Sequence, residues 1–244
     1  MNAVADNAYT RAWADIGNSI PTPKAILCIS AHWYIPAAAV TAMANPRTIH
    51  DFGGFPRELF EFEYPCPGSP DLAGRINDLL DGEVVMDADK WGVDHGTWSV
   101  LCHVFPAGDV PVVQLSLNDT EPATFHYELA NKLAPLREEG VLVIGSGNLV
   151  HNLHTYAWGD LTREPFDWAM RFDKQARELI VSGDHLPLVN YMSLGRDAML
   201  SAPTPEHYLP LLYVLALQRE GDQVSFPVEG FDGGSISMTT VRIG

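Results

Sequence analysis

Short, continuous runs of apolar residues alternate along this chain with longer segments of helical periodicity. The runs predict strands at Ala25–Ser30, Val40–Met43, Val110–Leu117 and Gly140–Ile144. Strands that are apolar on both faces have to be covered on both faces, and alternation with helices favours parallel pairing. The sequence therefore predicts an α/β fold: a single domain over residues 1–244, with a central, mostly parallel or mixed sheet covered by helices on both faces.

The segments of helical periodicity begin, in several cases, with a proline, which the first turn of a helix tolerates. They are Ala8–Ile16, Pro70–Leu80, Pro122–Arg137, Phe166–Val181 and Pro205–Leu217. The end of the chain has a different pattern. Gln223–Val228 and Ser235–Ile243 alternate like two strands, and Gly233-Gly234 between them predicts a turn.

The charge of the chain excludes one class of partner. Its 244 residues include 15 lysines and arginines against 31 aspartates and glutamates, a formal net charge of −16. Such an acidic chain is repelled by phosphate backbones and anionic membrane surfaces, so we expect neither a nucleic acid nor a membrane as a partner. Nothing in the sequence indicates an oligomeric state.

The cysteines and the N-terminus favour a cytoplasmic protein. Cys28, Cys66 and Cys102 are too few and too scattered for a disulfide framework or a zinc ribbon. The first residues, MNAVADNAYTRAW, lack the basic and then apolar order of a signal peptide, and no window of about 18 apolar residues is present.

Two histidines follow predicted strands: His32 in SAHWY and His151 in SGNLVHN. Ligands of open α/β sheets bind beyond the carboxyl ends of the strands, so this placement is the first functional signal. His95 in WGVDHGTW and His207 in PTPEHYLP, with Glu206 beside it, lie in similar settings rich in glycine, proline and aromatic residues.

Neutral imidazole is the commonest protein ligand of zinc, iron and related metals, so these four histidines suggest a mononuclear metal site. The remaining histidines are interpreted as structural: His50, His103, His126, His154 and His185. Other motifs are missing. The chain has no G-x-S-x-G elbow, Walker lysine, G-x-G-x-x-G after a strand, or H-E-x-x-H.

Seven strings together are specific for a family. SAHW, TIHDFGGFP, YPCPGSP, WGVDHGTW, PVVQLSL, SGNLVHN and TPEHYLPLLYVLA occur in this order over essentially the whole chain. In this set the chain resembles the DOPA-type extradiol ring-cleavage dioxygenases, which are class III extradiol dioxygenases. The resemblance implies a single α/β domain with one divalent metal ion.

The resemblance also implies roles for the histidines. His32 and His207 look like metal ligands. His151 looks like the histidine that faces the substrate, either as a further ligand or as an acid–base group. His95 looks like a second catalytic histidine that hydrogen-bonds the substrate or oxygen, and His50 in TIHDFGGFP is expected to shape the mouth of the pocket.

One expected motif is missing from the chain. The family usually opens with an apolar strand that ends in Gly-His-Gly-Ser-Pro, and the histidine of this motif is a metal ligand. Met1-Asn2 corresponds to the position just after this motif. We therefore expect this chain to lack that strand and ligand, so that His32, His151 and His207 provide three nitrogen ligands.

The implied chemistry needs a redox metal, because triplet oxygen does not react readily with a closed-shell catechol. Fe(II) is therefore expected for catalysis, with a catechol (DOPA or a smaller relative) and O₂ as substrates and a ring-opened semialdehyde as product. Zn(II) binds the same imidazoles but cannot perform the redox step. Two alternatives stay open: a zinc-dependent hydrolase on the same scaffold, and a catalytically silent metal-binding homologue.

Overall fold

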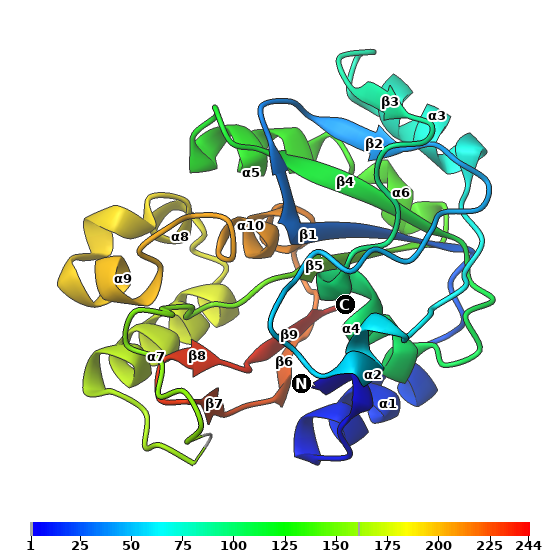
Figure 1. Ribbon diagram of the computed structural model, residues 1–244. Helices are drawn as coiled ribbons and strands as arrows, with labels where there is room; N and C mark the ends of the chain where they lie inside the picture. Colours follow the sequence, from blue (N-terminus) through cyan, green and yellow to red (C-terminus); the bar gives the residue numbers. More distant parts are fainter. Residues whose placement is uncertain (1, 161) are drawn as a thin grey trace. The chain divides into compact units, whose positions relative to one another are not determined.

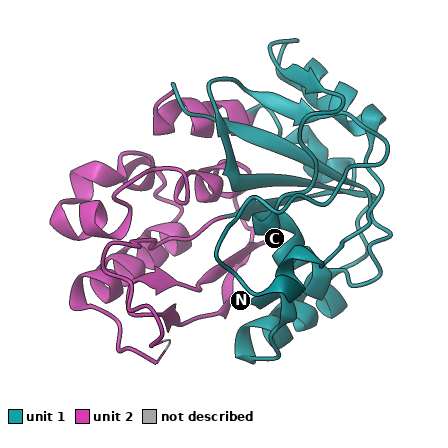
Figure 2. Cartoon of the chain, in the orientation of Figure 1, with its two compact units in different colours: residues 1–120, 132–146 teal, residues 121–131, 147–244 magenta. Residues whose placement is uncertain are grey.

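The computed structural model describes residues 2–160 and 162–244, which form two compact units (Figure 2). Unit 1 consists of the chain up to Thr120 together with Lys132–Ser146, and unit 2 of Glu121–Asn131 and Gly147–Gly244. The assignment of residues 1–244 to a single domain stays a prediction.

Unit 1 is built on one five-stranded sheet with the order β3-β2-β4-β1-β5 (Figure 1). Its strands are β1 (Ala25–Ile35), β2 (Ala39–Thr41), β3 (Val85–Asp87), β4 (Val112–Asn118) and β5 (Val141–Ser146). Both β4 and β5 run parallel to β1, and β3 runs parallel to β2, whereas β2 and β4 are antiparallel. The predicted α/β class with a central mixed sheet is therefore confirmed, although the pattern missed the short, half-exposed β3.

Strand β1 is longer than predicted and irregular in its second half. The prediction that it ends at Ser30 is wrong, because the strand continues to Ile35. Its pairing with β4 is regular up to Ile29 and resumes at Tyr34, and over this step β1 advances five residues while β4 advances two. The extra residues form a bulge, which redirects side chains locally. His32 therefore lies within this bulge and not beyond the strand.

The helices of unit 1 pack against the sheet and against each other. They are η1 (Asn2–Val4), α1 (Ala8–Ser19), α2 (Arg57–Phe60), α3 (Pro70–Leu79), α4 (His95–Val104) and α6 (Pro135–Glu138). Helix α4 contacts β1 and α1, α3 contacts β2, and α6 contacts β5. Helix α4 was not among the predicted helices, because its sequence HGTWSVLCHV is apolar on most sides and has little helical periodicity.

The long helix predicted at Pro122–Arg137 is wrong in its length. The structure divides this segment into α5 (Ala123–Asn131), which belongs to unit 2, and α6, which belongs to unit 1. Pro135 is the first residue of α6. A proline inside a helix has no N–H to donate and clashes with the carbonyl four residues before it, so the helix ends before Pro135 and a new one starts there.

Unit 2 consists of helices and two small antiparallel sheets. Its elements are α5, α7 (Asp167–Ser182), α8 (Leu186–Val189), η2 (Tyr191–Leu194), α9 (Arg196–Ser201), α10 (Leu209–Ala216), β6 (Val224–Val228), β7 (Phe231–Asp232), β8 (Ile236–Ser237) and β9 (Thr240–Ile243). Helix α10, with the sequence LPLLYVLA, packs against α5, and α7 packs against α9. The side chains of α10 are mostly buried and form the core of this unit.

The end of the chain follows the predicted pattern in part. The predicted turn at Gly233-Gly234 is present and joins β7 to β8, and both glycines have positive φ angles of 52° and 79°. The predicted strand Gln223–Val228 is confirmed as β6, whereas Ser235–Ile243 is divided into β8 and β9. Strand β7 was not predicted, and the pairs are β6 with β9 and β7 with β8. Among the described residues, no helix is long and apolar enough to cross a membrane.

Candidate functional site

The four histidines selected from the sequence form two pairs, one in each unit. His32 and His95 lie together in unit 1 with Asp51, and His151 and His207 lie together in unit 2 with Glu206. In each group, two imidazole nitrogens and one carboxylate oxygen lie within 4.8 Å of one another. The sequence analysis selected these four histidines for a single metal site and did not indicate which of them are neighbours, so their roles stay predictions.

In unit 1, a buried carboxylate fixes the start of helix α4. Oδ1 of Asp94 accepts hydrogen bonds from Oγ of Ser30 (2.8 Å) and from the backbone N–H of Thr97 (3.0 Å). Its Oδ2 accepts a hydrogen bond from Nε2 of Gln114 (2.7 Å). A carboxylate at the N-cap also interacts favourably with the helix dipole. These hydrogen bonds therefore connect the start of helix α4 to β1 and β4. His95 is the first residue of this helix.

A glycine allows His32 to lie against this first turn. A Cβ atom on Gly96 would lie only 2.7 Å from Cδ2 of His32 and 2.8 Å from Oγ of Ser30, which is closer than real contacts allow. The carbonyl of Gly96 accepts a hydrogen bond from Oγ of Ser146 at the end of β5. As a result, the rings of His32 and His95 lie 3.9 Å apart, with an angle of 51° between their planes.

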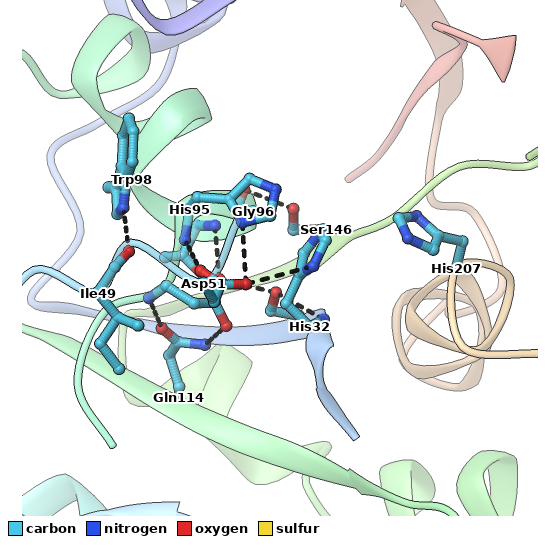
Figure 3. A network of polar contacts seen from close by, with 12 residues as sticks. His32, Ile49, Asp51, His95, Gly96, Trp98, Gln114, Ser146 and His207 are labelled. Atoms are coloured by element: carbon cyan, nitrogen blue, oxygen red, sulfur yellow. Dashed lines mark hydrogen bonds and ion pairs between the residues drawn. The ribbon is translucent and has the colours of Figure 1, made fainter. Parts of the chain in front are cut away.

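Asp51 lies between these two rings (Figure 3). Its Oδ2 is 2.9 Å from Nδ1 of His95 and 3.4 Å from Nδ1 of His32, and its Oδ1 accepts the backbone N–H of His95 at 2.9 Å. The contact with the His95 ring is close but poorly aligned for a hydrogen bond, so it is mainly electrostatic. Burial would raise the pKa of Asp51, but the contacts with His95 and His32 outweigh it and lower this pKa.

The lowered pKa keeps Asp51 ionised at neutral pH, and an ionised carboxylate can only accept hydrogen bonds. The negative charge of Asp51 therefore favours the hydrogen on the nitrogen that faces it, Nδ1, in both His32 and His95. In the neutral form of each ring, the lone pair then belongs to Nε2. Through Nε2, each ring can bind a metal ion or take up a proton.

The loop that carries Asp51 is held by aromatic packing. The indole of Trp98 on α4 donates a hydrogen bond to the backbone of this loop, and Nε2 of His50 lies 2.8 Å from the carbonyl of Phe62. Phe62 stacks on Trp98 with ring centroids 5.0 Å apart, and Phe52 contacts His95 edge-on at 5.2 Å. These apolar rings shield one side of His95 from water. The expected role of His50 at the pocket mouth stays a prediction.

In unit 2, His151 and His207 are stacked. Their ring centroids lie 3.5 Å apart and their planes are within 6° of parallel. Two protonated rings at this separation would repel each other, so the stacking disfavours a positive charge on both rings at once. Glu206 contributes the nearby carboxylate oxygen, and it also accepts a hydrogen bond from Thr204.

The segment after β5 positions this pair by a close backbone approach. The backbone N–H of Asn148 donates to the carbonyl of His207 at 2.8 Å, and a Cβ on Gly147 would lie 2.2 Å from the same carbonyl oxygen. Only glycine therefore fits at position 147. The backbone N–H of His151 donates to the carbonyl of Ser201 at 2.7 Å, which holds the main chain of the second histidine.

The histidines interpreted as structural make contacts that agree with this interpretation. The ring contacts are His103 with the backbone of Asn2, His126 with Tyr213, and His185 with Tyr127 and Gln218. The side chain of His154 is exposed. None of these residues belongs to either group of possible metal-binding side chains in the described part of the chain.

The sequence analysis missed three polar residues that contact the histidine pairs or the segments that carry them. Asp51 lies within TIHDFGGFP, Gln114 within PVVQLSL and Asn148 within SGNLVHN, so each belonged to a selected string but had no assigned role. A polar residue within a buried strand, such as Gln114, was the available signal, because burial requires a hydrogen-bonding partner.

Both groups have the chemistry of a metal site. A set of two imidazoles and one carboxylate is the arrangement that non-haem Fe(II) oxygenases use, and Zn(II) accepts the same ligands. The residues present therefore fit a divalent metal ion by their donor atoms.

A comparison with protein families decides the class of this chain. Residues 5–230 match the model described as "Catalytic LigB subunit of aromatic ring-opening dioxygenase". The chain belongs to this family. Its members' chemistry, extradiol ring cleavage by a dioxygenase, is thus the function of this enzyme, and the resemblance to class III extradiol dioxygenases is confirmed.

Individual relatives support the family assignment. The "4,5-DOPA dioxygenase extradiol" of Escherichia coli K12 is 48% identical, and the match covers 100% of this chain and 91% of that protein. The protein of the same name from Beta vulgaris is 39% identical over 90% of this chain and 82% of its own length. A crystal structure of an uncharacterized protein from Escherichia coli K12 matches with a TM-score of 0.86 and 41% identity, covering 99% of this chain and 94% of that one.

Proposed function

We propose that this dioxygenase cleaves a catechol, DOPA or a smaller relative, with O₂ to give a ring-opened semialdehyde. The observation that carries this proposal is the stacked pair of His151 and His207 beside Glu206, a set of donor atoms that suits a metal oxygenase. The relatives named as 4,5-DOPA dioxygenases support the choice of an ortho-dihydroxylated aromatic ring as the substrate class.

The proposed metal is Fe(II). His32, His151 and His207 are its proposed ligands because the family resemblance of their motifs implies this role, and not because of their arrangement in space. When bound, Fe(II) would supply the acidity that helps a catechol to lose a proton, and it would pass electrons from the catechol to O₂. The contribution of the protein is to present neutral rings, since only a ring with a lone pair on a fixed nitrogen can serve as a ligand.

We propose that His151 is also the acid–base residue of the reaction. A neutral imidazole can accept the proton of a phenolic hydroxyl and later return it to an oxygen of the opened ring. His95 is proposed to donate a hydrogen bond to the negative charge that develops on oxygen. Asp51 supports this role by orienting the ring, because its Oδ2 lies 2.9 Å from Nδ1 of His95.

The proposal is tested by oxygen consumption with a catechol under Fe(II) and, in parallel, under Zn(II). We expect oxygen uptake and a semialdehyde chromophore with Fe(II) alone, in a ratio of one O₂ to one ring. Hydrolysis of esters or amides under Zn(II) without oxygen uptake would replace the proposal by a hydrolase. A resorcinol of the same size is the control substrate, since its hydroxyls are not adjacent.

We further propose that the enzyme works in the cytoplasm, which the cysteines support. Cys28, Cys66 and Cys102 are all free thiols, and burial raises the pKa of each. Unpaired thiols are typical of a reducing compartment. Recovery of the native enzyme in a periplasmic fraction would contradict this proposal.

A further inference from the structure

The side chain of Asn148 is held in one orientation by two partners. Its Nδ2 donates a hydrogen bond to the backbone carbonyl of Ser237 at 2.9 Å. A carbonyl oxygen can only accept, so the NH₂ end of the amide has to face Ser237. The other end, Oδ1, then faces the ring of His207, 3.2 Å from its Nδ1.

This orientation determines which nitrogen of His207 carries the hydrogen. An amide oxygen can only accept a hydrogen bond, so Nδ1 has to be the donor. In the neutral ring, the lone pair then belongs to Nε2. The backbone N–H of Asn148 also donates to the carbonyl of His207 at 2.8 Å, so one residue contacts both the ring and the main chain of His207.

We propose that Asn148 is a positioning residue that fixes the tautomer of His207 with its lone pair on Nε2, ready for a metal ion. The inference rests on the metal-binding part of the proposed function. Partners of this kind orient ligating histidines in many metal sites. Unlike a carboxylate, the amide adds no charge next to the stacked pair of His151 and His207.

The tautomer is measured directly by long-range ¹H–¹⁵N NMR of the imidazoles in the metal-free protein. We expect Nδ1 of His207 to have the shift of a protonated nitrogen and Nε2 that of a nitrogen with a lone pair. The opposite pattern in the wild-type protein would overturn the proposal without any variant having to fold.

Two substitutions test the acceptor atom itself. Asn148→Leu removes the acceptor, and we expect a mixture of tautomers and a dissociation constant for Zn²⁺ raised about 10–100-fold, the usual effect of losing such a partner. Asn148→Asp keeps an acceptor, and we expect the wild-type tautomer. An unchanged tautomer in Asn148→Leu would overturn the proposal.

Gln218→Leu is the matched control. Gln218 is a second amide that faces a histidine of this unit, with Oε1 2.8 Å from Nε2 of His185. Its loss should change the tautomer of His185 and leave the Zn²⁺ affinity as in the wild type. The NMR and Zn²⁺ measurements use no catechol, so their results stay valid even if the protein does not cleave the ring. If His207 does not have the proposed tautomer, ring cleavage is still tested separately by oxygen consumption.

Discussion

The two histidine pairs of this enzyme are oriented by different means. In unit 1, the rings of His32 and His95 are tilted by 51° and share the ionised carboxylate of Asp51. In unit 2, the rings of His151 and His207 are parallel within 6° and are held by a neutral amide and by backbone hydrogen bonds. The group that faces Nδ1 is a charged carboxylate at His32 and His95 and a neutral amide at His207.

A hydrogen-bond donor and a metal ligand place different chemical requirements on a histidine ring. A nearby carboxylate stabilises the protonated form of a ring, which suits a group that donates to developing negative charge. A neutral acceptor fixes the tautomer without favouring protonation, which suits a ligand that has to stay neutral. The two pairs should therefore respond differently to substitution, and the following predictions test this.

The largest expected effect is on turnover in His151→Ala. Loss of an acid–base group lowers the rate of catechol cleavage by about 10²–10⁴, whereas the fold should persist because the ring is only half-buried. Oxygen uptake at saturating Fe(II) measures the rate, and His154→Ala, on the exposed side of the same loop, is the control. Unchanged uptake in His151→Ala would exclude both of its proposed roles, and loss of metal would favour the ligand role.

The next effect is on metal binding in His207→Ala and His32→Ala. Loss of a partner that hydrogen-bonds a metal ligand weakens metal binding by about 10–100-fold. Loss of the ligand itself should raise the dissociation constant of the metal by at least about 100-fold. Elemental analysis and Zn²⁺ titration measure it. His185→Ala and His103→Ala, one in each unit, are the controls. Equal metal content in the two ligand variants and the wild type would contradict the assignment.

A smaller effect is expected for Asp51→Asn. Asparagine keeps the shape but removes the charge that both rings of unit 1 face, so the rate should fall about 10–100-fold. Because Asn148 is unaffected, the tautomer of His207 should stay as in the wild type. Rate measurements and NMR of both pairs check this. A wild-type rate in Asp51→Asn would show that the carboxylate is dispensable.

The smallest effects concern stability. Gly147→Ala places a methyl group 2.2 Å from a backbone oxygen, and Gly96→Ala places one 2.7 Å from a side-chain carbon. Overpacking costs about 1–3 kcal/mol, and backbone yields less than side chains, so we expect the larger loss in Gly147→Ala. Gly74→Ala, in α3 with open space around it, should gain about 0.5–1 kcal/mol. Urea unfolding measures all three, and the reverse order for the first two would refute this reasoning.

How much could be predicted from the sequence depended on how local the signal is. The apolar runs located β1, β4 and β5, because a strand that is buried along its length consists of consecutive apolar residues. The continuation of β1 to Ile35 was not predictable in this way, since the bulge depends on its pairing with β4. The break at Pro135 was visible in the sequence, but its consequence, two helices in two units, was not.

For the site, the motifs identified the histidines but not the groups that orient them. Asp51 accepts the backbone N–H of His95, 44 positions along the chain, and Asn148 contacts a ring 59 positions away. Such contacts are set by tertiary structure, and an aspartate or asparagine in a loop has many local uses. The family resemblance implied roles for the histidines, whereas the residues that orient them can be identified only from the tertiary structure.

The hydrogen bonds of Asp94 have a consequence for motion. Its carboxylate joins the first turn of α4 to Ser30 of β1, and its own backbone N–H donates to Oε1 of Gln114 on β4 at 2.8 Å. We therefore expect the amide hydrogens of this turn to exchange slowly with solvent, because the hydrogen bonds that hold it reach two strands of the central sheet. His95 follows Asp94 directly in the chain, so slow opening of this turn would also keep the backbone of His95 in place.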